Sequence, residues 1–126
     1  MEILWHFTDD RPIYAQIIEQ IQLFIVSGVL APGCRLPSVR DMAAQAGVNP
    51  NTMQKALTEL EWMGLVFAQR TSGRYITEKE ELIQEMKTEL AREKIAEFLR
   101  SMEQIGFSRE QVTALIANYQ EGENHG

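Results

Sequence analysis

The chain has 126 residues, 44% of them hydrophobic, and carries a formal net charge of −6. This length holds one compact domain with an appendage rather than two large domains, and no stretch approaches the roughly 18 apolar residues that span a bilayer. The N-terminus also lacks the basic start and apolar run of a signal peptide, so we expect a cytoplasmic protein with no membrane contact.

Neither a metal site nor an active site is predicted. Cys34 is the single cysteine and the chain has only two histidines, so soft metal ligands are too few for a zinc site. No histidine stands with a nucleophile in a recognisable motif, and no glycine-rich phosphate loop or pair of acids stands out. We therefore expect no cofactor, no catalytic residue and no enzymatic activity.

The charge is unevenly distributed along the chain. Residues 1–77 hold six basic and seven acidic side chains, whereas residues 78–126 hold six and eleven. Within residues 35–77, five basic side chains outnumber three acidic ones, which gives a local charge of +2. Because binding responds to the local field rather than to the total charge, the middle of the chain is compatible with nucleic acid.

A first amphipathic helix is predicted between Pro12 and Gly28. Proline suits the first turn of a helix, and apolar residues then repeat at three- and four-residue steps until the glycine. A turn is predicted at 31–33. Residues 35–36 stand just before a proline, which leaves room for only a very short strand.

Two further helices joined by a three-residue turn form a predicted helix-turn-helix. Ser38 has the position of a capping residue for a short helix that ends at Gly47. Asn49 can then cap a third helix with Pro50 in its first position, and the buried stripe of that helix continues to Gly64.

A β-hairpin and two more helices complete the chain. Residues 65–69 and 74–77 are β-prone and are separated by a loop whose length and glycine suit a hairpin. Beyond the hairpin, the composition and apolar spacing indicate a long helix, and a capping box at Ser108 opens a final one. The predicted fold is mainly α with a small β-hairpin: a winged helix-turn-helix domain at 1–77, then a two-helix segment at 78–126.

The third helix carries side chains suited to reading bases. In a helix-turn-helix the second helix of the motif places its N-terminal residues in the major groove. Asn51 and Gln54 can each bond N6 and N7 of adenine, and the Thr52 methyl group can contact a thymine methyl group. Asn49 and Lys55 accompany them near the helix start. These residues predict sequence-specific binding to double-stranded DNA, with readout that favours adenine and thymine.

Two other elements are expected to contact the DNA backbone. Ser38 and the free amides at the start of the second helix form a phosphate site, to which Arg40 adds a charge. At the hairpin, a cation can enter the minor groove and a glycine permits close approach to a strand. The residues on or beside this tip are Arg70, Thr71, Ser72, Gly73 and Arg74.

Each of these signals also has an ordinary structural explanation. Ser38 and Asn49 are good helix starts in any protein, and hairpin arginines are often solvated charges. Their combination is much harder to obtain by accident. Winged helices also serve as protein-interaction modules, so a domain that docks proteins without binding DNA is the alternative function.

One family combines these features. Residues 36–76 read LPSVRDMAAQAGVNPNTMQKALTELEWMGLVFAQRTSGRYI, and this run closely resembles the DNA-binding domain of GntR-family bacterial transcription regulators. The VNPNT segment resembles the YtrA-like subfamily, and the similarity extends over about residues 10–77. The resemblance implies a phosphate contact at Arg40 and base-side contacts at Pro50, Asn51, Thr52 and Gln54.

The sequence departs from many family members at two places. Pro50 and Gln54 stand where other subfamilies have arginines, which removes two candidates for reading guanine and implies a different operator. At the hairpin, RTSGRY replaces the more usual arginine- and glycine-rich tip that ends in Gly-Thr-Phe. Either hairpin arginine, Arg70 or Arg74, could therefore supply the contact.

The segment after Thr77 is too short for the larger effector domains of the family and resembles the two-helix dimerisation region of YtrA-like members. Both helices also carry more apolar surface than either can bury alone, which favours pairing with a second chain. A helix folded back on its own domain is the other explanation. The apolar residues assigned to the dimer are Ile83, Met86, Leu90, Ile95, Phe98, Met102, Leu115, Ile116 and Tyr119.

Together these features predict a homodimeric repressor that reads a palindromic operator with the helix at 49–64. The two-fold symmetry of such a dimer sets half-sites about 10 base pairs apart. Without a separate ligand domain, any small-molecule effector would bind at the dimer interface or between the domain and the helices, and would alter the spacing of the recognition helices. The sequence identifies no such effector.

Overall fold

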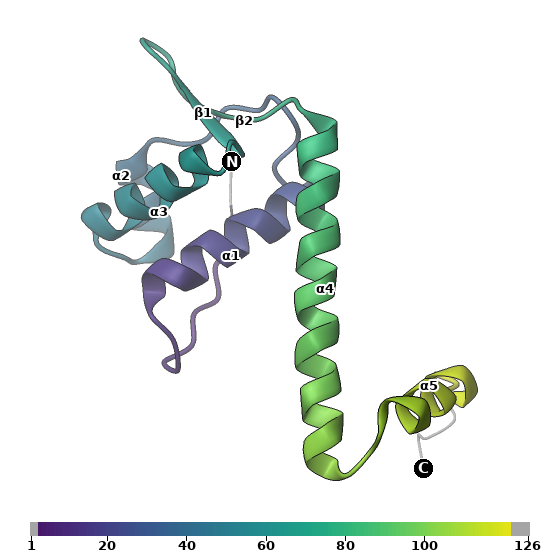
Figure 1. The fold of residues 1–126 in the computed structure, drawn as a ribbon. Coiled ribbons are helices and arrows are strands. Elements are labelled where there is room, and N and C mark those ends of the chain that lie inside the picture. Colours follow the sequence, from purple (N-terminus) through teal and green to yellow (C-terminus); the bar gives the residue numbers. More distant parts are fainter. Residues whose placement is uncertain (1–2, 122–126) are drawn as a thin grey trace. The chain divides into compact units, whose positions relative to one another are not determined.

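The structure is a computed structural model that describes residues 3–121 (Figure 1). The chain forms two compact units, Met1–Lys87 and Thr88–Gly126, and one helix runs from the first unit into the second. The predicted two-helix segment ends in residues 122–126, which lie outside the described part. The elements are α1 (Ile13–Val26), α2 (Val39–Ala46), α3 (Pro50–Trp62), β1 (Val66–Gln69), β2 (Gly73–Ile76), α4 (Glu80–Ile105) and α5 (Arg109–Asn118).

The predicted first helix is confirmed as α1. Pro12 precedes its first residue in an extended conformation, and the chain turns helical immediately after the fixed proline φ of −55°. Ile17, Ile21 and Ile25 recur every four residues, and all three are buried. The apolar stripe of α1 therefore faces the core of the first unit.

The predicted helix-turn-helix is confirmed as α2 and α3. The Ser38 hydroxyl caps α2 by accepting a hydrogen bond from the Asp41 amide at 3.1 Å. Gly47 ends α2 with a φ of 71°, a left-handed conformation that glycine adopts without a steric penalty. The Asn49 carbonyl oxygen Oδ1 then accepts from the Asn51 amide at 2.7 Å, and Pro50 takes the first position of α3.

The predicted hairpin is confirmed as β1 and β2, an antiparallel pair that extends away from the helices (Figure 1). Its register places Val66 opposite Ile76, and both are buried. The predicted short strand is reduced to a single bridge between Arg35 and Tyr75, flanked by a hydrogen bond from the Leu36 amide to the backbone of β2 at 2.8 Å. We call this hairpin, with its turn, the wing.

The core of the first unit is formed by α1, α2, α3 and the wing. Contacts join α3 to α1, to α2 and to β1, so α3 is the central element. Burying side chains from all of these elements fixes the angle at which α3 is presented, because a packed interior tolerates few alternative arrangements. The fully buried apolar residues include Ile17, Ile21, Leu30, Met42, Met53, Leu57, Leu60 and Ile76.

An N-terminal arm (residues 3–8) lies along α1, which the sequence did not predict. The Gln16 side chain is only 2% exposed; it accepts from the Thr8 amide at 2.8 Å and donates to the Thr8 carbonyl at 2.8 Å. Trp5 stacks on Phe7 and meets the edge of Phe24 from α1. Gln16, a polar side chain inside an apolar helix face, therefore holds the arm in place together with these aromatic contacts.

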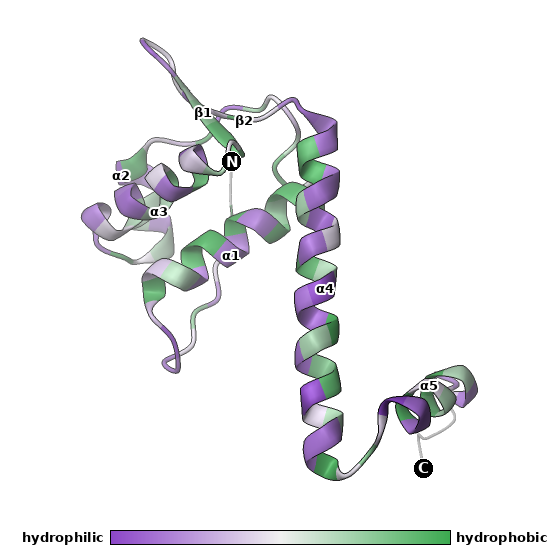
Figure 2. Ribbon diagram, viewed as in Figure 1, coloured by the Kyte–Doolittle hydropathy of each residue, from purple (hydrophilic) through white to green (hydrophobic). Residues whose placement is uncertain are grey.

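The second unit consists of the later turns of α4 followed by α5. The predicted capping box is confirmed: Ser108 accepts from the Gln111 amide, and the Gln111 side chain accepts from the Ser108 amide. Val112 is 2% exposed, but most other apolar side chains of this unit remain accessible. Figure 2 shows hydrophobic residues at intervals along both helices. None of the described helices combines the length and apolarity needed to cross a bilayer.

Candidate nucleic-acid interface

The exposed face of α3 carries the side chains predicted to read bases. Asn51, Gln54 and Lys55 are exposed, whereas Thr52 is half-buried. Met53 and the other apolar residues on the opposite face are buried in the core. The helix therefore presents amide and ammonium groups to solvent from its first two turns, which are the turns that enter the major groove in this type of motif.

Two contacts hold the longer side chains of this face in defined positions. Gln54 donates from Nε2 to the Thr58 hydroxyl at 3.3 Å, one turn along α3, which leaves its carbonyl oxygen and one amide hydrogen free. The Lys55 ammonium lies 4.7 Å from the centre of the Tyr14 ring on α1. Such a cation–π contact steadies a charge without neutralising it. Tyr14 was not among the predicted site residues, because only the packing of α1 against α3 brings it near Lys55.

The predicted phosphate site lies at the start of α2. Ser38 and Arg40 are both exposed, and Ser38 caps the helix. The first backbone amides of a helix have no partner within the helix and carry partial positive charge. This terminus can therefore bind a phosphate oxygen, with Arg40 supplying the full charge.

The residues predicted at the wing differ in their exposure and in their partners. Arg70 and Thr71 are exposed in the turn, and Ser72 donates to the Gln69 side chain at 3.2 Å. Arg74 instead forms an ion pair with Glu61 of α3, and its side chain is only 20% exposed. The Arg74 charge is thus locally compensated, while that of Arg70 faces solvent.

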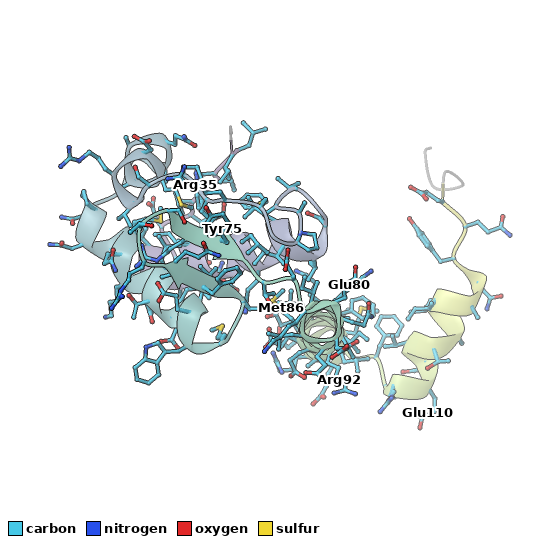
Figure 3. The ribbon with its side chains drawn as sticks, turned by 90° about the horizontal axis from the view of Figure 1, so that it is seen from above. Arg35, Tyr75, Glu80, Met86, Arg92 and Glu110 are labelled. Carbon is cyan, nitrogen blue, oxygen red and sulfur yellow. The ribbon has the colours of Figure 1, made fainter. Side chains whose placement is uncertain are left out.

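Sequence analysis did not assign Arg35 to the site, but the structure brings it to the wing. A Cβ atom built on Gly73 would lie 3.3 Å from the Arg35 Nε atom. Figure 3 shows Arg35 beside Tyr75, the residue whose backbone it pairs with. The only sequence signal for this contact was the very short strand predicted before Pro37. The sequence does not indicate which strand that segment pairs with.

The residues assigned to a dimer fall into three groups. Met86 is 9% exposed and Ile83 is half-buried within the first unit, so burial inside one chain accounts for their apolar character. In the second unit Leu90 and Met102 are half-buried. The remaining residues of the set are exposed: Ile95, Phe98, Leu115, Ile116 and Tyr119.

Four residues of the exposed group, all except Ile95, line a groove in the second unit. It has a volume of about 480 Å³ and is lined by one residue of α4 and four of α5. Side chains of this size seldom stay in water over a contiguous surface, because transferring their apolar area out of water is favourable. The lining residues are Phe98, Leu115, Ile116, Asn118 and Tyr119.

Comparison with known proteins identifies relatives that match from about half to most of the chain. The model of the family described as bacterial regulatory proteins, gntR family, matches residues 13–76. The uncharacterized HTH-type transcriptional regulator YhcF of Bacillus subtilis is 41% identical over 116 residues, 92% of this chain and 96% of that protein. The HTH-type transcriptional repressor YtrA of the same organism is 46% identical over 67 residues, 53% of this chain and 52% of YtrA.

Solved structures show the same fold. A GntR family transcriptional regulator from Listeria monocytogenes superposes with a TM-score of 0.81 at 33% identity, covering 90% of this chain and all of that one. The DNA-binding domain of AraR in complex with an operator superposes with a TM-score of 0.55 at 26% identity, covering 61% of this chain and 99% of that one. These relatives are named as transcriptional regulators and not as enzymes. The chain belongs to the GntR family as a YtrA-like transcriptional regulator with a winged helix-turn-helix DNA-binding domain.

Proposed function

We propose that this regulator is a repressor that binds a palindromic operator as a homodimer and reads the major groove with α3. The observation that carries the proposal is the polar face of α3, on which Asn51, Gln54 and Lys55 are exposed over two adjacent turns. Amide side chains suit adenine, and Thr58 orients Gln54 through their hydrogen bond. The operator is therefore expected to be rich in adenine and thymine at the positions under α3.

Contacts to phosphate groups fix the register of α3 on the DNA. Ser38 and Arg40 at the start of α2 supply one such contact, Lys55 a second, and Arg70 on the wing a third. Each contact releases condensed counterions, so about six contacts per dimer give a slope near −5 for log affinity against log salt concentration. Binding to any DNA should thus weaken steeply as salt rises.

The exposed apolar groove of the second unit supports the homodimer. Burying Phe98, Leu115 and Ile116 against the same residues of a second copy forms an isologous interface, in which one patch meets itself. Two-fold symmetry then pairs two α3 helices with two half-sites about 10 base pairs apart, or a close variant. The similarity to YhcF extends over 116 residues, 92% of this chain, and therefore includes most of this unit.

The repressor assignment is supported by the relative YtrA, which is named a transcriptional repressor. A dimer bound across a promoter also blocks polymerase by occupancy alone, without an activating surface. No residue of the chain is assigned to an effector. If a small molecule regulates the protein, it acts by changing the distance between the two α3 helices.

The test is binding of the purified chain to its own promoter region and to random DNA of equal length over a salt series. The proposal expects preference for the promoter, a slope of about −5 or steeper, and a footprint of two symmetric half-sites. A repressor also lowers transcription from that promoter in a purified system. No salt-sensitive preference would reject the proposal, and size exclusion with and without DNA would then test the protein-docking alternative.

A further inference from the structure

Three basic side chains reach the wing, and the structure separates their roles. Arg70 is exposed in the turn, and Arg74 is paired with Glu61 of α3. Arg35 comes from the connector between α1 and α2 and is exposed. Within residues 3–121, no carboxylate lies close enough to Arg35 to form an ion pair. Its charge is therefore available to an external anion.

Backbone hydrogen bonds on either side of Arg35 hold it against β2 as an isolated bridge. The Leu36 amide donates to the Arg74 carbonyl at 2.8 Å, and the Ile76 amide donates to the Cys34 carbonyl at 2.9 Å. These bonds place Arg35 directly opposite Tyr75. The backbone of the arginine is thus fixed by these two hydrogen bonds and does not lie in a free loop.

The Arg35 side chain runs from there toward the tip of the wing. A Cβ atom on Gly73 would lie 3.3 Å from Nε and 3.5 Å from the second guanidinium nitrogen, so the guanidinium occupies space that any other residue would fill. Gly73 also has a φ of 106°, which favours glycine. Glycine is therefore favoured at position 73 for two structural reasons: its positive φ, and the space that the Arg35 guanidinium occupies.

The two faces of the wing explain why Arg35 and Arg74 differ. Side chains alternate between faces along a strand, so Gly73 and Tyr75 share one face, and Arg74 lies on the other. Phe67 stacks on Tyr75 on the first face, with ring centres 5.7 Å apart. The second face turns toward α3, where Glu61 compensates Arg74. Arg35 thus lies on the face that the helices leave open.

We propose that Arg35 is a DNA-contacting residue of the wing, and that it binds a phosphate group of the backbone next to the groove entered by the turn at 70–72. This inference rests on the proposed DNA-binding function. In this arrangement Arg74 holds the wing against α3, and the wing contacts the DNA through the charges of Arg35 and Arg70. A planar guanidinium is well suited to a phosphate because it donates two parallel hydrogen bonds.

The experiment compares Arg35→Gln with Arg74→Gln on promoter and random DNA. With Arg35 the phosphate contacts rise to about eight per dimer, which gives a wild-type slope near −7. Removing one contact per protomer lowers the slope of a dimer by about two and returns it to near −5. Arg35→Gln is expected to show this reduction, with an affinity loss of about tenfold on both DNAs, while Arg35→Lys retains most of the slope. Arg74→Gln should keep the wild-type slope and instead lower the thermal midpoint, because it leaves Glu61 unpaired.

Two outcomes would overturn the assignment. An unchanged slope for folded Arg35→Gln, checked by circular dichroism, would remove Arg35 from the interface. A drop in slope for Arg74→Gln equal to that for Arg35→Gln would show that Arg74 leaves Glu61 to bind DNA. If the wild-type chain itself shows no salt-sensitive binding, the DNA-binding proposal fails first, so the two failures are distinguishable.

Discussion

Single residues on α3 and α2 are expected to contribute to DNA binding in different ways, one through base recognition and the other through phosphate contact. Gln54 is positioned to contact a base edge, so Gln54→Ala should cost about 1–3 kcal/mol on the operator and little on random DNA. Arg40 is positioned for phosphate, so Arg40→Ala should weaken both DNAs by a similar factor and reduce the salt slope. Competition binding with the two DNAs measures the difference.

The matched control for Gln54 is Gln84→Ala, an exposed glutamine on α4 outside the proposed interface. It should leave both affinities unchanged. If Gln54→Ala and Arg40→Ala reduce the two affinities in the same ratio, the division into base reading and phosphate binding is wrong. Thr58 belongs to the same test, because loss of its hydroxyl frees the Gln54 amide to rotate.

Some of these side chains were identifiable from sequence, and others were not. Asn51, Gln54 and Lys55 follow from helical spacing, which is a local property of α3. The ion pair of Arg74 with Glu61 depends on how the wing docks on α3, a distance that no spacing rule provides. Arg35 was missed for the same reason: its neighbour Gly73 is 38 residues away along the chain.

Among the elements, the N-terminal arm depends most on one side chain. Gln16→Leu removes an amide that bonds the Thr8 amide, the Thr8 carbonyl and the Arg11 carbonyl, the last at 2.7 Å. The backbone groups in these part-buried hydrogen bonds would lose their partners, so the free energy of unfolding should fall by about 1–3 kcal/mol. Urea denaturation measures the loss, and limited proteolysis should show earlier cleavage in residues 3–8.

Gln20→Leu is the matched control on the same helix. Gln20 also bonds the arm, through the His6 amide at 3.0 Å, but this contact is exposed and water replaces it at little cost. The unfolding free energy should therefore change by less than about 1 kcal/mol. Equal effects from the two substitutions would show that burial does not determine how the arm is held.

The contrast between the arm and the helices shows which elements sequence could predict. The caps Ser38, Asn49 and Ser108 mark helix starts through bonds to residues two or three positions away, and all three helices begin where those residues indicate. The arm has no regular secondary structure and is fixed by side chains up to 19 residues away. Its position follows from packing on α1, which periodicity does not encode.

For the whole molecule, the exposed groove of the second unit links assembly to DNA affinity. Ile116 is 59% exposed in the single chain and lines the groove with Phe98 and Tyr119. A proposed dimer buries this position, so Ile116→Glu would place an unpaired carboxylate in an apolar interface, which costs several kcal/mol. Light scattering should then report the mass of one chain where the wild type gives twice that mass.

The same substitution should also reduce DNA binding without touching the DNA surface. A palindromic operator is held by two linked domains, and the second contact is intramolecular only while the dimer persists, so affinity should fall by about 100-fold or more. Ala117→Glu supplies the control, because it adds the same charge at an exposed position on the side of α5 opposite the groove. It should leave mass and affinity unchanged. An Ile116→Glu chain that stays dimeric would place the interface elsewhere, and a monomeric chain with full operator affinity would disprove binding as a dimer.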